Sequence, residues 1–198
     1  MGTYYEWVAD LDVNEHDAPE VGRRVVEALV ARGVILPELS PDAALGGDGH
    51  PAGPAWADTV GASASGEPPW GVEVRVGRAV QDGGQFDVGS VTCPRCSATR
   101  EFFGPPEEFG PTCSDEEGLG VFYAAAEAWS EGDAGSEADL ECRACGVATP
   151  VVEWRAGGAA LTCLAFVFWG WDELRPEVLR WVAGATGGHR IASGSGKI

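Results

Sequence analysis

Two Cys-x-x-Cys pairs constrain this sequence more than any other feature. The first pair is Cys93 and Cys96, the second is Cys142 and Cys145, and an acidic segment lies between them. Each pair directs two sulfur atoms toward one point, and two pairs supply the four thiolates that a tetrahedral zinc ion binds. Because four sulfur ligands leave no position for water or substrate, the pattern predicts a structural metal ion and not a catalytic one.

Residues beside the cysteines support a metal site. Arg95 and Arg143 lie within the pairs, where a guanidinium can offset the negative charge of a metal bound to four thiolates. Gly146 suits the left-handed turn that often closes such a loop, whereas Ser97 takes the corresponding place after the first pair. With these motifs, residues 91–146 resemble a rubredoxin-like zinc ribbon.

The resemblance implies one structural zinc ion, and likeness to rubredoxin itself makes iron the alternative metal. We expect zinc, because the rest of the chain shows no site for an electron-transfer partner. Two disulfides are a further alternative, but such pairs in a chain without a signal peptide are more often metal or redox sites. Cys113 and Cys163 have no partner at ligand spacing, so we expect them to be buried small residues.

The charge of the chain limits its partners. The formal net charge is −18, and the stretch from Glu101 to Cys142 contains acidic residues but no Lys or Arg. Such a surface would repel phosphates, so it argues against nucleic acid as a partner. Two interpretations remain: the acidic face keeps the protein soluble, or it docks a basic protein partner.

The composition also bears on the compartment. No apolar run is long enough to cross a bilayer and no charged, apolar leader is visible, so we expect a cytoplasmic protein without membrane contact. The dominance of Ala, Gly, Val, Arg and Pro, with Lys197 as the single lysine, indicates a GC-rich bacterial genome.

Hydrophobic periodicity predicts the order strand, helix, strand, strand, helix, strand around the cysteine-rich segment. The predicted strands are 3–13, 72–76, 161–171 and 189–193, the flanking helices are 19–33 and 176–187, and a short helix covers 119–129 inside the insertion. The order predicts an α+β fold, the ferredoxin-like β-α-β-β-α-β sandwich, with its first and third strands central. Residues 1–90 and 147–198 would form the sandwich, and residues 91–146 the inserted zinc ribbon. We expect the strand 3–13 to have one solvated face and the terminal GSGK to be flexible.

The helices of such a sandwich cover one sheet face only. The third predicted strand has Leu164, Phe166 and Phe168 on one face and Cys163, Val167 and Trp169 on the other. The second face therefore needs a cover. The Gly- and Pro-rich segment 40–70 is either a linker or a lid, and Trp56 and Trp70 favour a lid. We expect this lid and the ribbon to cover the second face, with a partner molecule as the alternative.

Three functions are compatible with the sequence. The favoured one is a non-catalytic, immunity- or adaptor-like protein whose zinc-stabilised, acidic surface docks a basic partner. A nucleic-acid-associated regulator would depend on arginines of the sandwich, namely Arg23, Arg24, Arg32, Arg75, Arg78 and Arg180. An enzyme or small-ligand-binding protein would use a pocket under segment 40–70. Its candidate groups are Asp48, His50, Asp58, His189 and Arg190, but they form no recognisable catalytic set, and we expect no catalytic residue.

Overall fold

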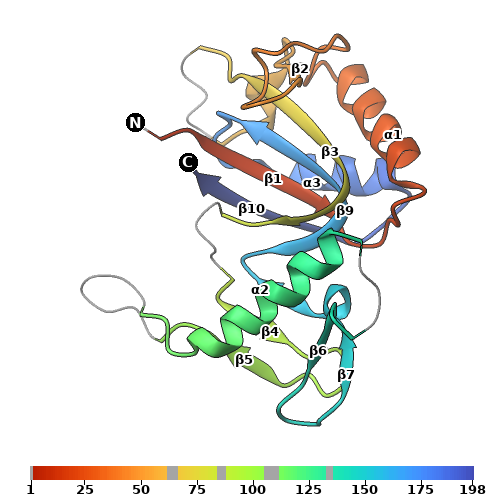
Figure 1. The fold of residues 1–198 in the computed structure, drawn as a ribbon. Helices are drawn as coiled ribbons and strands as arrows, with labels where there is room; N and C mark the ends of the chain where they lie inside the picture. The colour runs from red at the N-terminus through yellow and green to blue at the C-terminus, as the bar shows by residue number, and fades with distance from the viewer. Residues whose placement is uncertain (1, 62–66, 84–87, 105–111, 133–135) are drawn as a thin grey trace.

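The computed structural model describes residues 2–61, 67–83, 88–104, 112–132 and 136–198. Its larger sheet has five antiparallel strands in the order β10-β1-β9-β3-β2 (Figure 1). These strands are β1 (Tyr4–Asp10), β2 (His50–Pro51), β3 (Gly71–Gln81), β9 (Ala160–Trp169) and β10 (Ile191–Lys197). The chain therefore mixes helices with antiparallel sheets, as predicted.

β9 lies in the middle of this sheet because it is apolar on both faces. All ten of its residues are buried, as a strand with both faces covered requires. β1 pairs with β9 along one side and with β10 along the other. Val8 and Asp10 of β1 are buried together with Trp7 and Ala9. The prediction of one solvated face for this strand is therefore wrong, because both faces of the sheet are covered at β1.

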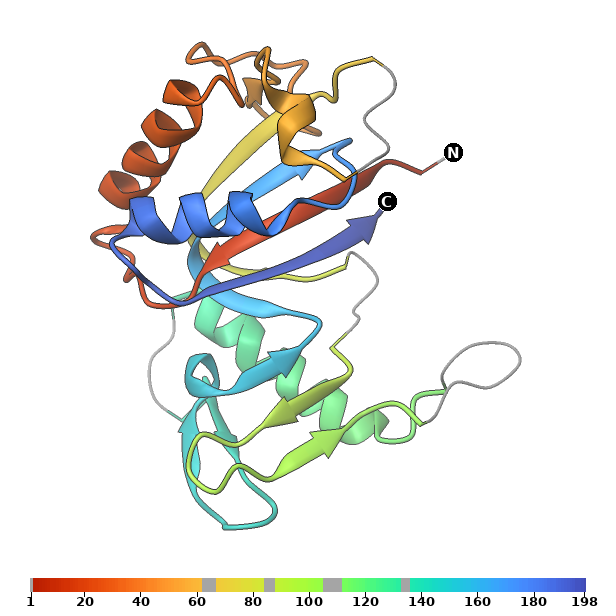
Figure 2. The same ribbon diagram turned by 180° about the vertical axis from the view of Figure 1, so that it is seen from behind.

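Two helices cover one face of the sheet (Figure 2). They are α1 (Ala18–Ala31) and α3 (Pro176–Thr186), and each has a proline in its first turn, where the fixed φ and the missing N–H are tolerated. Val25 of α1 and Val178 of α3 are fully buried and belong to one core with Phe166 of β9. Each helix buries its apolar side against the sheet, which accounts for the amphipathic pattern of both helices.

The described part of segment 40–70 packs on the body of the protein. It contains β2, which pairs with β3, and the 3-10 helix η1 (Trp56–Thr59). The indole N–H of Trp171 donates to Thr59 Oγ1 at 2.9 Å, so η1 is attached to the chain that follows β9. The described residues of this segment are thus attached to the body of the protein.

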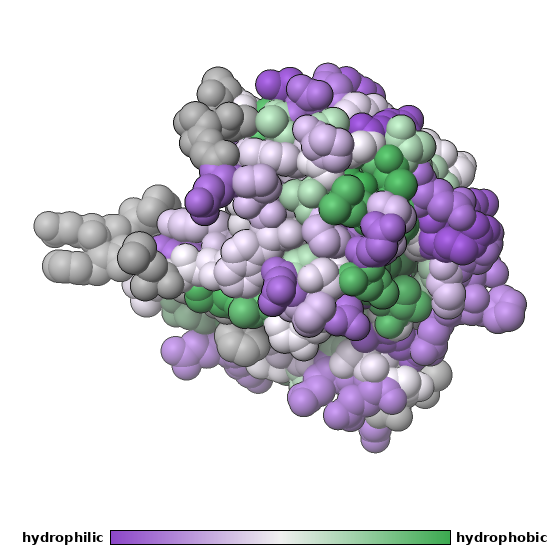
Figure 3. Space-filling view, turned by 90° about the horizontal axis from the view of Figure 1, so that it is seen from above, coloured by the Kyte–Doolittle hydropathy of each residue, from purple (hydrophilic) through white to green (hydrophobic). Residues whose placement is uncertain are grey.

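Exposed leucines lie just before this segment and within it. Leu36, Leu39 and Leu45 are 40, 61 and 45 % exposed. Figure 3, which views the molecule from above, shows apolar side chains interspersed with polar ones on this side. Separate exposed leucines are ordinary on a protein surface.

The second face of the sheet is covered largely by the bent end of β3. The pairing of β3 with β9 shifts between Val76 and Ala79, beside Gly77 with its φ of +114°, and the strand then curves across the sheet (Figure 1). The Tyr5 hydroxyl donates to the carbonyl oxygen of Asp82 at 3.0 Å. Ala44 of segment 40–70 joins the same core. The chain therefore covers its own second face, but largely with the end of β3, whereas the sequence predicts a cover made by the lid and the ribbon.

The terminal GSGK is not a flexible tail, and that prediction is wrong. These residues belong to β10 and pair with β1. A Cβ atom at Gly194 would lie 2.6 Å from the Trp7 ring, and one at Gly196 would lie 2.3 Å from the Tyr5 ring. Glycine is needed there because the aromatic rings of β1 lie directly over the backbone of β10.

A second group of elements lies beyond the end of the sheet (Figure 1). It contains a three-stranded sheet in the order β5-β4-β8, the two-stranded sheet β6-β7, the helix α2 and the 3-10 helix η2. The bounds are β4 (Ser90–Thr92), β5 (Thr99–Glu101), α2 (Glu116–Ser130), β6 (Asp139–Glu141), β7 (Ala148–Pro150), η2 (Val151–Glu153) and β8 (Arg155–Gly157). We call residues 88–157 the cysteine module. The predicted insertion, 91–146, lies within it, and β8 extends it to Gly157. In the described part of the chain, every helix is too short or too polar to span a membrane.

Candidate metal centre

Two hairpin turns with the same backbone pattern carry the cysteines. Cys93 and Cys96 lie between β4 and β5, and Cys142 and Cys145 lie between β6 and β7. In the first turn, the N–H of Ser97 donates to the carbonyl of Cys93 at 3.1 Å. In the second turn, the N–H of Gly146 donates to the carbonyl of Cys142 at 2.7 Å. The N–H of Cys142 donates to the carbonyl of Val147 at 3.1 Å. Short strands on either side thus fix both turns.

Each turn is closed by a residue in the left-handed region. Gly146 has a φ of +69° and Ser97 has a φ of +59°. Ser97 is the one non-glycine residue with positive φ in the described part of the chain. A side chain is disfavoured in this conformation, so the first turn retains a strained residue at the place where the second has glycine.

The four sulfur atoms gather at one point. All of them lie within 4.8 Å of one another, and the Sγ atoms of Cys96 and Cys142 are 3.7 Å apart. Tetrahedral zinc with Zn–S bonds of about 2.3 Å requires sulfur atoms roughly 3.8 Å apart. The donor set therefore fits a metal ion, and the predicted convergence of the four cysteines is confirmed. All six cysteines of the chain are unbonded, so the disulfide alternative does not apply.

The thiols influence one another's protonation. Backbone N–H groups, that of Cys145 above all, lower the pKa of Cys142 to about 7. The N–H of Ala98 lowers the pKa of Cys96, but loss of solvent and the three neighbouring thiols outweigh it and raise the value to about 12. Loss of the first proton from the cluster is thus favoured, whereas loss of further protons is opposed. Such a cluster becomes fully ionised only when it binds a cation.

The arginines inside the turns attach them to the rest of the module. Arg95 lies 3.5 Å from Glu153 of η2, and Arg143 lies 3.4 Å from Glu117 of α2. Both guanidiniums are more than half exposed. They therefore pair with carboxylates as well as adding positive charge near the cysteines.

The remaining cysteines lie apart from this centre. Cys163 is buried on β9, where burial raises the pKa of its thiol. Cys113 is half-buried and forms an isolated bridge with Phe103. Neither belongs to the four-sulfur cluster.

The candidate groups for an enzyme do not form one site. His50 lies on β2 and bonds the carbonyl of Leu36 through Nδ1 at 3.1 Å, whereas His189 precedes β10 at the opposite edge of the sheet. Asp48 and Asp58 are exposed, and Arg190 pairs with Asp12 at 2.6 Å.

Sequence reasoning missed the pairing of His189 with Asp10. The Asp10 side chain is fully buried and its Oδ2 lies 2.8 Å from His189 Nδ1. Its Oδ1 accepts the backbone N–H groups of Asp12 and Val13. The partners are 179 residues apart, so the sequence offers no local signal for this pair.

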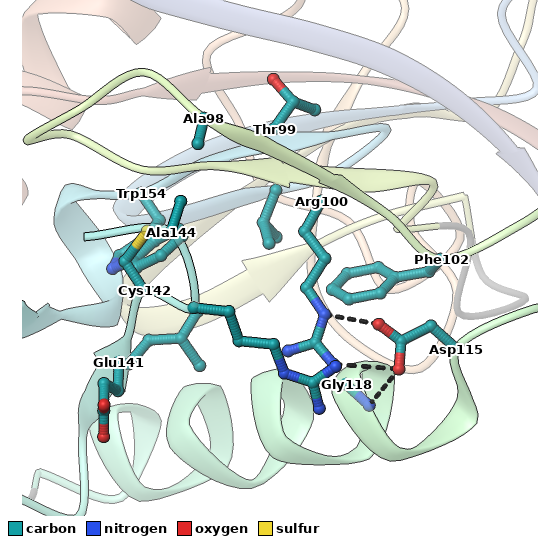
Figure 4. A pocket seen from close by; sticks show the side chains of 13 residues that line it. Ala98, Thr99, Arg100, Phe102, Asp115, Gly118, Glu141, Cys142, Ala144 and Trp154 are labelled. Atoms are coloured by element: carbon teal, nitrogen blue, oxygen red, sulfur yellow. Dashed lines mark hydrogen bonds and ion pairs between the residues drawn. The ribbon is translucent and has the colours of Figure 1, made fainter. Parts of the chain in front are cut away.

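A small pocket adjoins the metal centre (Figure 4). Its volume is about 230 Å³, and its apolar wall includes Phe102, Leu140 and Trp154. On the other side Arg100 forms a two-point ion pair with Asp115, with Nη2 2.9 Å from Oδ1, and this contact holds the pKa of Asp115 below its usual range.

The Arg100 guanidinium lies flat on the first turn of α2. A Cβ atom at Gly118 would be 2.0 Å from Arg100 Nη2, so any side chain at this position would displace the guanidinium. Asp115 also accepts the N–H of Gly118 at 3.0 Å and caps the helix. One carboxylate thus fixes the start of α2 and the wall of the pocket.

Carboxylates cover the outside of the module. The exposed ones among the described residues are Glu101, Glu116, Glu117, Glu127, Glu131, Glu137, Glu141 and Glu153. Glu117 and Glu153 form ion pairs, with Arg143 and Arg95. The other carboxylates of this set have no ion pair within the described residues, so the module presents unmatched negative charge on its surface.

Together these features define a class: a mixed α and β protein with antiparallel sheets and a four-cysteine cluster compatible with a zinc-ribbon-like metal site. No family model, curated protein sequence or solved structure matches this chain. Function therefore has to be inferred from the site itself.

Proposed function

We propose that this protein is a non-catalytic interaction protein, held rigid by one zinc ion, whose acidic surface docks a basic protein partner. The observation that carries the proposal is the set of exposed carboxylates without an ion pair on the module that holds four converging sulfur atoms. Four sulfur ligands close the coordination shell, so the ion supplies rigidity and no open position for chemistry. Zinc suits this donor set, and we prefer it to iron because we see no site for an electron-transfer partner beside the cluster among the described residues.

We also propose that the larger sheet with α1 and α3 is a ferredoxin-like sandwich that carries the cysteine module as an insertion. The strand order β10-β1-β9-β3 supports this, because it matches the spatial order of the fourth, first, third and second strands of that fold. An insertion that is held rigid by a metal ion and carried by a folded sandwich is a suitable surface for binding a partner protein.

The arginines of the sandwich favour a protein partner over nucleic acid. Arg23 pairs with Glu20 and Glu27, and Arg75 pairs with Glu73. Arg78 and Arg180 have similar carboxylate partners. Four of the six candidate arginines are therefore already neutralised and offer little to phosphates. Arg24 and Arg32 have no ion pair within the described residues.

The proposal is tested by removing charge from the module and, as a matched control, from the sandwich. The first variant carries glutamine at Glu127, Glu131, Glu137 and Glu141. The control carries the corresponding amides at Glu38, Asp42, Asp48 and Asp58. Both variants lose four exposed acids, so general charge effects are equal in the two.

Affinity capture at low and high salt is then compared for the wild type and both variants. We expect basic proteins to be retained by the wild type and the control, lost from the module variant, and released by salt. Retention of the same proteins by all three forms, or binding that salt does not weaken, would contradict the proposal. Metal analysis of the purified protein should find one zinc per chain.

A further inference from the structure

The pocket beside the metal centre has the size of a single side chain. Its volume is about 230 Å³, below the roughly 300–1,000 Å³ of sites that enclose drug-sized ligands. It opens between the strands of the two small sheets and the first turn of α2 (Figure 4). A nucleotide or large cofactor would not fit, but one aromatic or branched aliphatic side chain would.

The side chains of Arg100, Asp115 and Trp154 in the pocket wall already have hydrogen-bond partners. Arg100 and Asp115 bind one another, and the N–H of Gly118 donates to Asp115. The indole N–H of Trp154 donates to Thr149 Oγ1 at 2.9 Å. An occupant therefore gains little from its own hydrogen-bonding groups there, and contact with Phe102 and Leu140 favours an apolar one.

The surroundings of the pocket select the residues next to such an anchor. Glu141 lies in the pocket lining and has no ion pair within the described residues. Glu116 and Glu117 follow the cap residue on the exposed side of α2. Of the positive groups nearby, Arg100 is neutralised by Asp115 and Arg143 pairs with Glu117. The rim therefore leaves negative charge unmatched, which attracts Lys and Arg.

We infer that this pocket receives one large apolar side chain from a partner protein segment that has basic residues on both sides of it. The inference rests on the proposed function and adds a binding motif to it: charge brings the partner to the module, and the apolar anchor fixes its position. A few buried apolar anchors commonly dominate the affinity of protein interfaces.

Defined peptides test the motif. The probes are acetylated and amidated Arg-Lys-Arg-Phe-Arg-Lys-Arg, the same peptide with Ala in place of Phe, and Asp-Glu-Asp-Phe-Asp-Glu-Asp. Binding to the zinc-loaded full chain is measured by calorimetry at low and high salt. We expect the Phe peptide to bind on the order of tenfold more tightly than the Ala peptide, because it alone fills the pocket. We expect the acidic peptide not to bind.

Two variants locate the binding. Ala144→Trp fills the pocket, because Ala144 lines it, whereas Ala148→Trp adds the same side chain at an exposed position outside the lining. We expect the first to reduce the affinity for the Phe peptide to that for the Ala peptide and the second to change neither. Metal content and circular dichroism establish that each variant is folded.

The outcomes separate the two proposals. Equal, salt-sensitive binding of the Phe and Ala peptides would overturn the pocket inference and leave the acidic docking surface standing. Binding of neither basic peptide would overturn both, and tight binding of the acidic peptide would overturn the basic motif. If Ala144→Trp does not fold, the comparison of Phe and Ala peptides on the wild type still decides.

Discussion

Replacement of Glu6 by glutamine should stabilise the protein at alkaline pH. Glu6 is half-buried on β1, beside a cavity of about 470 Å³ that Glu173 also lines. Burial, with smaller contributions from the charges of Glu173 and Asp172, raises the pKa of Glu6 from 4.5 to about 7. The folded protein therefore keeps the proton that the unfolded chain has released, so stability is present below pH 4.5 and is lost as the pH rises to about 7.

The size of the effect follows from this shift. The difference between a pKa of 4.5 and one of about 7 corresponds to about 3 kcal/mol. Because the side chain is partly solvated, screening reduces this to about 1–2 kcal/mol. Urea unfolding of wild type and Glu6→Gln should differ by that amount at pH 8 and by little at pH 4.5. A gain of equal size at both pH values would refute the reasoning, and Glu131→Gln on α2 serves as an exposed control.

Four further changes address the metal turns, the edge strand and α3. Cys96→Ser removes one of the four ligands, so native mass spectrometry should no longer find one bound zinc ion per chain. The control Cys163→Ser should still bind one zinc ion per chain. Zinc bound to both variants would show that the ligand set is different. Ser97→Gly should raise the free energy of unfolding by about 0.5–1 kcal/mol, because glycine tolerates the φ of +59°; a loss on urea titration would contradict this. Gly194→Ala should lower thermal stability by about 2 kcal/mol or more, since its Cβ meets Trp7. At Gly184, with open space around the Cβ, alanine should stabilise α3 by up to about 1 kcal/mol.

Much of the fold could be predicted because its signals are local. The apolar run that became β9, and the Pro-Glu-Val openings of α1 and α3, each contain their own evidence. The cysteine cluster was predictable because the four ligands lie in two short motifs. Spacing alone was sufficient there.

Other features depend on partners that are distant in sequence. β10 contains Ser193, Gly194 and Gly196, which suggest a mobile tail until the rings of Trp7 and Tyr5 are placed above them. β8 has only three residues and no periodicity, so its pairing with β4 could not be foreseen. The pocket is likewise assembled from five separate stretches of chain.

The chain leaves the larger sheet for the cysteine module and returns to the sheet at the same place. Gln81 of β3 and Ala160 of β9 are direct pairing partners, although about eighty residues separate them, and closing an unstructured loop of that length carries an entropic cost. A module already compacted around its metal brings the two strand ends together before they pair. Metal supply during synthesis should therefore set how fast the central strands find each other, even though the four cysteines lie outside these strands.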